Sequence, residues 1–290
     1  MQINQLHPLF VGEIIGLDTS APVTPETVQA VEDAMAKYAV CVVRNASLND
    51  QDLIRFARAF GPLELPAGGG KRIAPELYDI SNLDANGEIR KPVPGAPDPA
   101  DFERFHTDSP FNSLPTKWSF LLAFVVPPEG GNTDYVDTRA VYEDLPQSMK
   151  DRIENLSADH DMFRALELRG VKFGDEKLRK MYPRMSHPLV RTSASGRKAL
   201  YFGWHAVSIT GWTEEESRPL LDELYEFATQ SKYVYSHKWN PGDMVIWDNR
   251  CTMHSPTPFD RYRYKRDLRR ATINEYGPEV PGIENAGTAA

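Results

Sequence analysis

A histidine and an aspartate stand two residues apart at His106 and Asp108, inside the run Phe-His-Thr-Asp-Ser-Pro-Phe at 105–111. In an extended segment, residues i and i+2 point to the same side, so this imidazole and this carboxylate converge on one point. They would supply two ligands of a 2-His-1-carboxylate site, which binds non-haem Fe(II) and leaves coordination positions open. Because such a triplet also arises by chance, the rest of the chain has to supply a third ligand.

Among the seven histidines, His254 has the best context for that third ligand. It follows a strand-like run at 244–247 and lies far from His106 in sequence, as a facial triad built on a jelly roll requires. Taken alone, His254 would be interpreted as an ordinary structural histidine. Together with the His-x-Asp triplet and the arginines that follow it, His254 favours a metal site.

The segment beyond His254 is strongly basic and contains Arg261, Arg263, Lys265, Arg266, Arg269 and Arg270. A solvated charged face is the usual interpretation of such a run. Arg270, however, begins a β-branched strand at 270–273, where an unpaired charge facing a core would cost free energy. A guanidinium matches a carboxylate bidentately, so we expect an anionic partner for Arg270, for example a bound carboxylate. Arg269, whose side chain points the opposite way in a strand, is expected to face outwards.

Size, composition and charge are those of a globular protein. The 290 residues are 41% hydrophobic and 26% charged, and the formal net charge is -8. This charge disfavours nucleic acid and anionic membrane as main partners, because both attract basic surfaces. A small anionic organic substrate remains compatible with it, since a local basic pocket can exist on an acidic protein.

The sequence shows no targeting signal and no cysteine motif that would indicate a function. Met1 is followed by polar residues rather than a signal-peptide pattern, and no apolar stretch approaches the roughly 18 residues of a membrane span, so we expect a cytoplasmic location. Cys41 and Cys251 form no CxxC pair, and packing is the favoured role for both.

Turn and capping signals divide the chain into early helices and many short strands. Helices are expected after Thr24, after Asn49, within 139–156, near 176–181, and from Thr213 to residue 230. Strands are expected at 39–43, 77–81, 118–126, 132–136 and 268–276, with hairpins across 193–196 and 240–243. This order predicts a mainly β, α+β fold with a double-stranded β-helix (jelly-roll, cupin-like) core and flanking helices.

Two segments stand apart from that core. Residues 66–105, rich in Gly and Pro, predict either a disordered surface excursion or a lid over the metal, and their direct continuation into His106 favours the lid. Residues 139–187 predict a charged, largely helical insert.

Several of these motifs jointly resemble the Fe(II)/2-oxoglutarate-dependent dioxygenases of the taurine dioxygenase and 2,4-dichlorophenoxyacetate dioxygenase family. The resemblance spans most of the chain, from the opening Leu-His-Pro-Leu-Phe at 6–10 to residue 273, and it is closer to the phenoxyacetate type. It is carried by His-Thr-Asp at 106–108, Pro-Pro-Glu-Gly-Gly-Asn-Thr at 127–133, Trp-Asn-Pro-Gly-Asp at 239–243, Asp-Asn-Arg at 248–250, His254, Arg266 and Arg-Arg-Ala-Thr at 269–272.

The resemblance implies residue roles and an activity. His106, Asp108 and His254 would be the iron ligands, Thr133 and Arg266 would bind the distal carboxylate of 2-oxoglutarate, and Arg270 would bind the anionic group of the substrate. The implied reaction uses Fe(II), 2-oxoglutarate and O2 to hydroxylate a C–H bond of a small carboxylate, with succinate and CO2 as co-products. Residues 1–290 would form one catalytic domain, and a homodimer is expected.

Four other residues are candidates for contact with the substrate. Lys71 and Arg72 in the expected lid would meet a substrate carboxylate, or would simply be solvated. His205 would line the pocket or be a packed core histidine, and Phe111 would wall an apolar substrate or pack in the core.

The sequence leaves alternatives for the substrate and for the class of protein. The substrate would be an aryloxyalkanoate-like ether, an alkylsulfonate, an amino-acid derivative or a natural-product intermediate. A cupin-like metal hydrolase or isomerase with the same triad would need no basic residue at Arg266, and a non-catalytic jelly-roll binding protein would need no bound metal.

Overall fold

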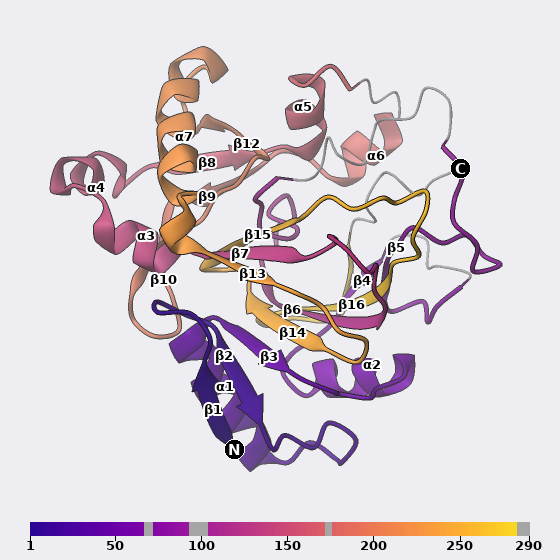
Figure 1. The fold of residues 1–290 in the computed structure, drawn as a ribbon. Helices are drawn as coiled ribbons and strands as arrows, with labels where there is room; N and C mark the ends of the chain where they lie inside the picture. The colour runs from indigo at the N-terminus through magenta and orange to yellow at the C-terminus, as the bar shows by residue number, and fades with distance from the viewer. Residues whose placement is uncertain (67–71, 93–103, 172–175, 283–290) are drawn as a thin grey trace.

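The structure, a computed structural model, describes residues 1–66, 72–92, 104–171 and 176–282. Its larger sheet contains, in spatial order, β1 (Gln2–Gln5), β2 (Gly12–Ile15), β3 (Val40–Val43), β14 (Met244–Asp248), β6 (Thr116–Val125), β16 (Asp267–Asn274) and β5 (Tyr78–Ser81). A smaller sheet, formed by β13 (Val234–His237), β7 (Thr133–Asp137) and β15 (Thr252–Pro256), lies above it (Figure 1). These two sheets are the jelly-roll core that the sequence predicted.

Three smaller strand groups flank this core. One consists of β12 (Ala206–Ile209), β8 (Ser157–His160) and β9 (Met185–Pro188); the others pair β10 (Val190–Thr192) with β11 (Lys198–Leu200), and β17 (Val280–Gly282) with β4 (Glu64–Pro66). The helices are α1 (Pro25–Tyr38), α2 (Asp50–Arg58), α3 (Thr138–Asp144), α4 (Gln147–Ile153), α5 (Met162–Glu167), α6 (Glu176–Met181) and α7 (Glu214–Ala228). The helical insert expected at 139–187 therefore also contains strands.

Side-chain alternation along the central strands explains the layers. On β14, Val245 and Trp247 pack into the cluster between the two main sheets, which also contains Tyr135 of β7. The alternate residues Met244 and Ile246 pack into the cluster that holds α1 and α2. Because successive side chains of a strand point to opposite faces, both faces of this sheet are apolar and buried, and helices cover its outer side.

The helix starts follow the capping signals of the sequence. Thr24 accepts a hydrogen bond from the Thr27 amide (3.2 Å) at the start of α1. Asn49 and Asp52 form a reciprocal capping box at α2. These local bonds satisfy backbone amides that have no partner within the helix, so they fix where each helix begins. The predicted starts of α1 and α2 are therefore confirmed.

One predicted hairpin is wrong. β13 and β14 do not pair with each other across 240–243: β13 pairs with β7, and β14 pairs with β3 and β6. The turn itself is bound to other segments, since the Gly242 amide donates to the Ala123 carbonyl (2.7 Å) and the Ala46 amide donates to the Gly242 carbonyl (2.7 Å). The turn therefore takes the chain from the smaller sheet to the larger one. The hairpin across 193–196 is confirmed by β10 and β11.

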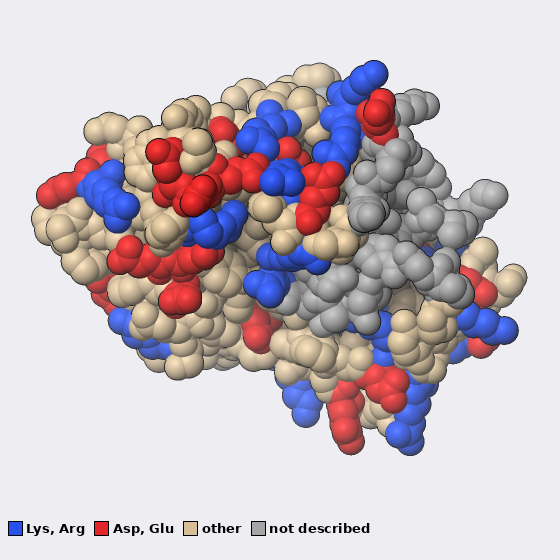
Figure 2. Space-filling model, turned by 90° about the horizontal axis from the view of Figure 1, so that it is seen from above, with Lys and Arg blue, Asp and Glu red and all other residues tan. Residues whose placement is uncertain are grey.

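The face of the molecule seen from above in Figure 2 carries charges of both signs. Glu214, at the start of α7, accepts hydrogen bonds from Arg164 (2.9 Å) and Arg184 (3.3 Å). These arginines are therefore paired with a carboxylate.

Among the described residues, no helix is both long enough and apolar enough to cross a membrane.

Candidate metal centre

His106 and His254 lie side by side because their backbones pair directly. The His106 amide donates to the His254 carbonyl (3.0 Å), and the His254 amide donates to the His106 carbonyl (2.8 Å). This isolated antiparallel bridge joins the segment before β6 to β15. It brings the two imidazole ring centroids to 4.2 Å from each other.

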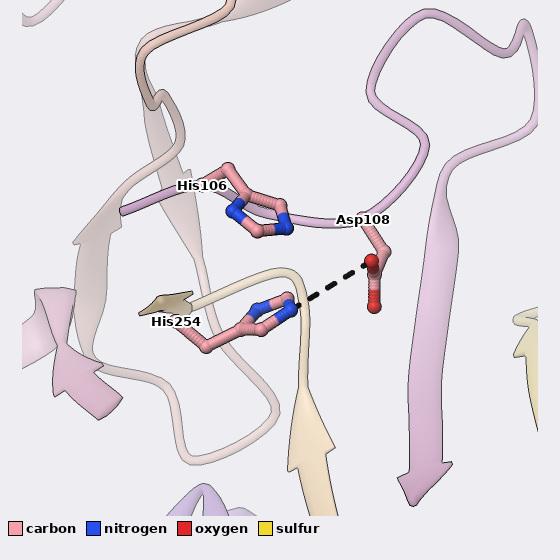
Figure 3. Close-up of side chains that lie close together, drawn as sticks. All are labelled: His106, Asp108 and His254. Carbon is pink, nitrogen blue, oxygen red and sulfur yellow. Dashed lines mark ion pairs between the residues drawn. The ribbon is translucent and has the colours of Figure 1, made fainter. Parts of the chain in front are cut away.

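Asp108 completes the group from the same segment as His106. Each of the three side chains offers one ligand atom, and these atoms all lie within 4.8 Å of one another. The nearest approach between His254 and Asp108 joins Nε2 to Oδ1 at 3.8 Å, and the three side chains converge in Figure 3. The structure thus brings together the two histidines and the aspartate that the sequence singled out.

Hydrogen bonding and burial put the donors in the state that metal binding requires. His106 Nδ1 lies 2.7 Å from the Arg104 carbonyl, so Nδ1 carries the proton and Nε2 keeps its lone pair. Desolvation lowers the pKa of both His106 and His254, which keeps the imidazoles neutral. Burial alone would raise the pKa of Asp108, but the charge of Arg270, together with the hydrogen bond from Ser119, outweighs it and lowers this pKa to about 2. Two neutral imidazoles and one carboxylate suit Fe(II).

Asn249 orients the aspartate. Its Oδ1 accepts hydrogen bonds from the Asp108 amide (3.0 Å) and from Trp247 Nε1 (3.0 Å), and its Nδ2 donates to Ser119 Oγ (3.0 Å). Ser119 Oγ in turn donates to Asp108 Oδ2 (2.7 Å). Sequence reasoning noted the Asp-Asn-Arg motif at 248–250 but assigned Asn249 and Ser119 no role. The sequence offered one signal, an amide that directly follows the apolar strand run and Asp248; the structure shows that this amide is fully buried.

One buried arginine borders the group, and a second lies at the start of β7. Arg270 pairs with Asp108, and its guanidinium lies 4.5 Å from the centroid of the Tyr78 ring. Arg266 Nε donates to the Gly131 carbonyl (3.2 Å), two residues before Thr133. Both arginines are 7% exposed. The structure therefore places one cation beside the ligand carboxylate and the other at the start of β7.

The neighbouring basic residues have other partners. Arg269 points to the opposite face of β16 from Arg270, as the strand period requires, but it is only 12% exposed and pairs with Asp50 of α2 (3.0 Å). The expectation that Arg269 faces outwards is therefore wrong. Arg72 donates to Asp267 (2.8 Å) and also pairs with Asp79, so it is a structural cation rather than a solvated loop residue.

The remaining candidates are distributed as follows. Phe111 packs against a cluster of the insert that contains Met162 and Phe163. His205 is 1% exposed, and its Nδ1 lies 3.0 Å from His160 Nδ1. His160 and His187 showed no partner pattern in the sequence, but in the fold His187 Nε2 lies 2.7 Å from the Pro110 carbonyl. Lys71 lies outside the described residues, as do 67–70 and 93–103 of the expected lid.

Comparison with known proteins also identifies relatives that are dioxygenases. The family model "Taurine catabolism dioxygenase TauD, TfdA family" matches residues 2–272. The chain is 40% identical over 285 residues to the alpha-ketoglutarate-dependent 2,4-dichlorophenoxyacetate dioxygenase of Burkholderia sp. (strain RASC), with 94% of each chain covered. It is 34% identical over 244 residues to the (S)-phenoxypropionate/alpha-ketoglutarate-dioxygenase of Sphingobium herbicidovorans, which covers 79% of this chain and 80% of that one.

A solved structure supports the fold and the site type. The crystal structure of AAD-2 in complex with Mn(II) and N-oxalylglycine matches with a TM-score of 0.85 at 37% identity, covering 96% of this chain and 100% of that one. The family match, these relatives and the His-Asp-His group agree. The chain therefore belongs to the TauD/TfdA family and is an Fe(II)- and 2-oxoglutarate-dependent dioxygenase.

Proposed function

We propose that this dioxygenase oxidises a C–H bond of a small carboxylate whose structure resembles an aryloxyalkanoate. Arg270 is the observation that carries the proposal: a buried guanidinium lies directly beside Asp108 of the metal group. A guanidinium in such a place can bind a substrate carboxylate bidentately and hold the neighbouring carbon near the metal. The names of the two relatives, which specify a phenoxyacetate and a phenoxypropionate, agree with this substrate class.

His106, Asp108 and His254 would hold the Fe(II). When bound, Fe(II), 2-oxoglutarate and O2 would supply the oxidising chemistry, in which O2 oxidatively decarboxylates 2-oxoglutarate to succinate and CO2 and provides the second oxygen atom for the substrate. The protein's own contribution is to fix three donors on one side of the ion. The Asn249 amide and the His106–His254 backbone bridge maintain that arrangement.

Thr133 and Arg266 would bind the distal carboxylate of 2-oxoglutarate. Thr133 Oγ1 accepts a hydrogen bond from Trp239 Nε1 (3.1 Å), so its own hydroxyl proton is available for an anion. The bond from Arg266 Nε to Gly131 orients the guanidinium towards the same end of β7. Two anionic ligands would thus have two separate cations, Arg266 and Arg270.

The walls of the substrate site are proposed from the same region. Phe111 would contact the apolar part of the substrate, because it lies three residues after Asp108 and is only partly buried. His205 would contribute a polar contact, since Gly203 brings this segment close to His106.

Succinate release across a panel of small acids tests the proposal. The panel pairs phenoxyacetates with sulfonates of matched shape, and adds amino-acid derivatives. Phenoxyacetates should stimulate succinate release above the rate without substrate and should yield the corresponding phenol. Preference for the matched sulfonates, or for the amino-acid derivatives, would overturn the assignment of the substrate class while leaving the dioxygenase class intact.

A further inference from the structure

Glu64 is a fully buried carboxylate close to the Arg270 guanidinium, although it is not part of the metal group. It lies on β4 and is 0% exposed. Its Oε1 accepts hydrogen bonds from the Tyr78 hydroxyl (2.7 Å) and from Ser109 Oγ (2.5 Å), and its Oε2 accepts one from Thr116 Oγ1 (2.9 Å). Burying a carboxylate costs free energy unless hydrogen bonds offset its desolvation. The three hydroxyl groups supply those hydrogen bonds to Glu64.

The first of these bonds leads to Arg270. Tyr78 and Arg270 are direct partners in the antiparallel pair of β5 and β16, so their side chains lie against each other. The guanidinium is 4.5 Å from the Tyr78 ring centroid on one side and pairs with Asp108 on the other. Since Glu64 holds the Tyr78 hydroxyl, it fixes the ring against which the guanidinium rests.

The second bond leads to the metal group. Ser109 follows Asp108 directly and has a φ of 48°, in the left-handed region that strains a residue with a side chain. The bond from Ser109 Oγ to Glu64 helps to hold this conformation. The third donor, Thr116, lies on β6 at its pairing with Asn274 and contacts neither Arg270 nor Asp108 through any described hydrogen bond.

We propose that Glu64 is a positioning residue for substrate binding: it acts through Tyr78 to hold the Arg270 guanidinium in the orientation that receives the substrate's anionic group. This inference rests on the proposed role of Arg270. An arginine side chain has many rotamers, and fixing them before the substrate arrives lowers the entropy lost on binding.

Direct binding of 2,4-dichlorophenoxyacetate to the Mn(II)- and 2-oxoglutarate-loaded enzyme, measured by calorimetry without oxygen, tests the inference. Tyr78→Phe keeps the ring and removes only the hydroxyl bond to Glu64; it should raise the Kd for this acid up to about tenfold, the upper end of the effect of having to immobilise one rotamer-rich side chain on binding. The Kd for 2-oxoglutarate and the Mn(II) affinity should stay unchanged. Thr116→Val is the matched control, because it removes another hydroxyl bond to Glu64 and should leave all three affinities unchanged.

A double-mutant cycle tests whether Glu64 acts on Arg270 through Tyr78. If Glu64 acts through Tyr78, then Tyr78→Phe should have no further effect in a Glu64→Ala background. Full additivity of the two substitutions, or an equal loss in Thr116→Val and Tyr78→Phe, would overturn the inference. Thermal unfolding of every variant identifies any that fails to fold, and Tyr78→Phe alone still decides the question if Glu64→Ala is lost.

Arg270→Ala separates this inference from the proposed function. If Arg270→Ala does not weaken binding of 2,4-dichlorophenoxyacetate, the assignment of Arg270 to the substrate is wrong. If it does weaken binding whereas Tyr78→Phe does not, only the role of Glu64 is wrong.

Discussion

His106 and His254 exchange both of their backbone hydrogen bonds, at 3.0 and 2.8 Å, although they belong to segments far apart in sequence. The bridge holds the two imidazoles together through main-chain atoms rather than through flexible side chains. A site whose donors are placed by backbone pairing is organised before a metal arrives. This arrangement leads to predictions for the ligands, their supports and the neighbouring cations.

Replacing Asp108 with Asn should lower the affinity for Mn(II) by more than about 100-fold, beyond the range typical of changes outside the ligand shell. A neutral amide replaces the only anion of the group, whereas the shape of the side chain is kept. Electron paramagnetic resonance of free Mn(II) measures the loss. Asp151→Asn, on the exposed surface of α4, serves as the control, and an equal affinity in both variants would exclude Asp108 as a ligand.

Asn249→Ala should weaken Mn(II) binding by about 10- to 100-fold, the usual range for a residue that orients a metal ligand. The substitution removes the acceptor for the Asp108 amide and the donor to Ser119. Asn132→Ala is a suitable comparison because Asn132 Nδ2 makes only a long bond to Ser236 (3.4 Å). If Asn249→Ala lowered the unfolding temperature but left the Mn(II) affinity intact, its role would be purely structural.

Arg270→Ala should raise KM for the substrate at least tenfold more than KM for 2-oxoglutarate, and Arg266→Ala should do the reverse, as loss of one charged hydrogen-bonding group predicts. Steady-state kinetics with each ligand varied in turn measures both ratios. Arg269→Ala should change neither KM, because this side chain pairs with Asp50 on the other face of β16. Equal effects of Arg270→Ala on the two KM values would mean that the two cations are misassigned.

Stability of the metal-free protein should fall as the pH drops below 6.5. Burial, together with the nearby His187 and Arg191 charges, lowers the pKa of His160 to about 3, whereas an unfolded histidine titrates near 6.5. Between these values the unfolded state binds the additional proton, so each such histidine lowers the free energy of unfolding by up to about 1.4 kcal/mol per pH unit.

His160→Gln tests this pH dependence by removing one titrating group. Chemical denaturation between pH 7 and pH 5 should show a shallower decline for the variant than for the parent. Identical slopes would indicate that His160 is not neutral and buried in the folded protein.

Local signals in the sequence were sufficient wherever the decisive interaction was itself local. The capping groups Thr24 and Asn49 begin α1 and α2 because each bonds the backbone amide three residues further along the chain. The hairpin of β10 and β11 closes over its own turn. The His-x-Asp triplet places two side chains on one side of an extended segment through the strand period alone, and the structure has them together.

Non-local bonds account for the misassigned elements. The turn at 240–243 has a hairpin sequence, yet its backbone bonds to Ala123 and Ala46 take β13 and β14 into different sheets. Arg269 was expected in solvent because no strand pattern reveals that Asp50 of α2 lies across from it. In each case the partner comes from a distant segment, so its position depends on the packing of the whole fold.

The sequence by itself determined the kinds of groups available: two imidazoles and a carboxylate of the right types, a β-rich chain with apolar central strands, and one arginine, Arg270, in a strand where an unpaired charge would be costly. Only the tertiary structure decided how these groups combine. It joined His106 to His254 through a backbone bridge, surrounded Asp108 with Asn249, Ser119 and Arg270, and buried Glu64 behind Tyr78. The reason is physical: composition and period set which face a side chain occupies, whereas the partner across that face is set by the packing of sheets against each other.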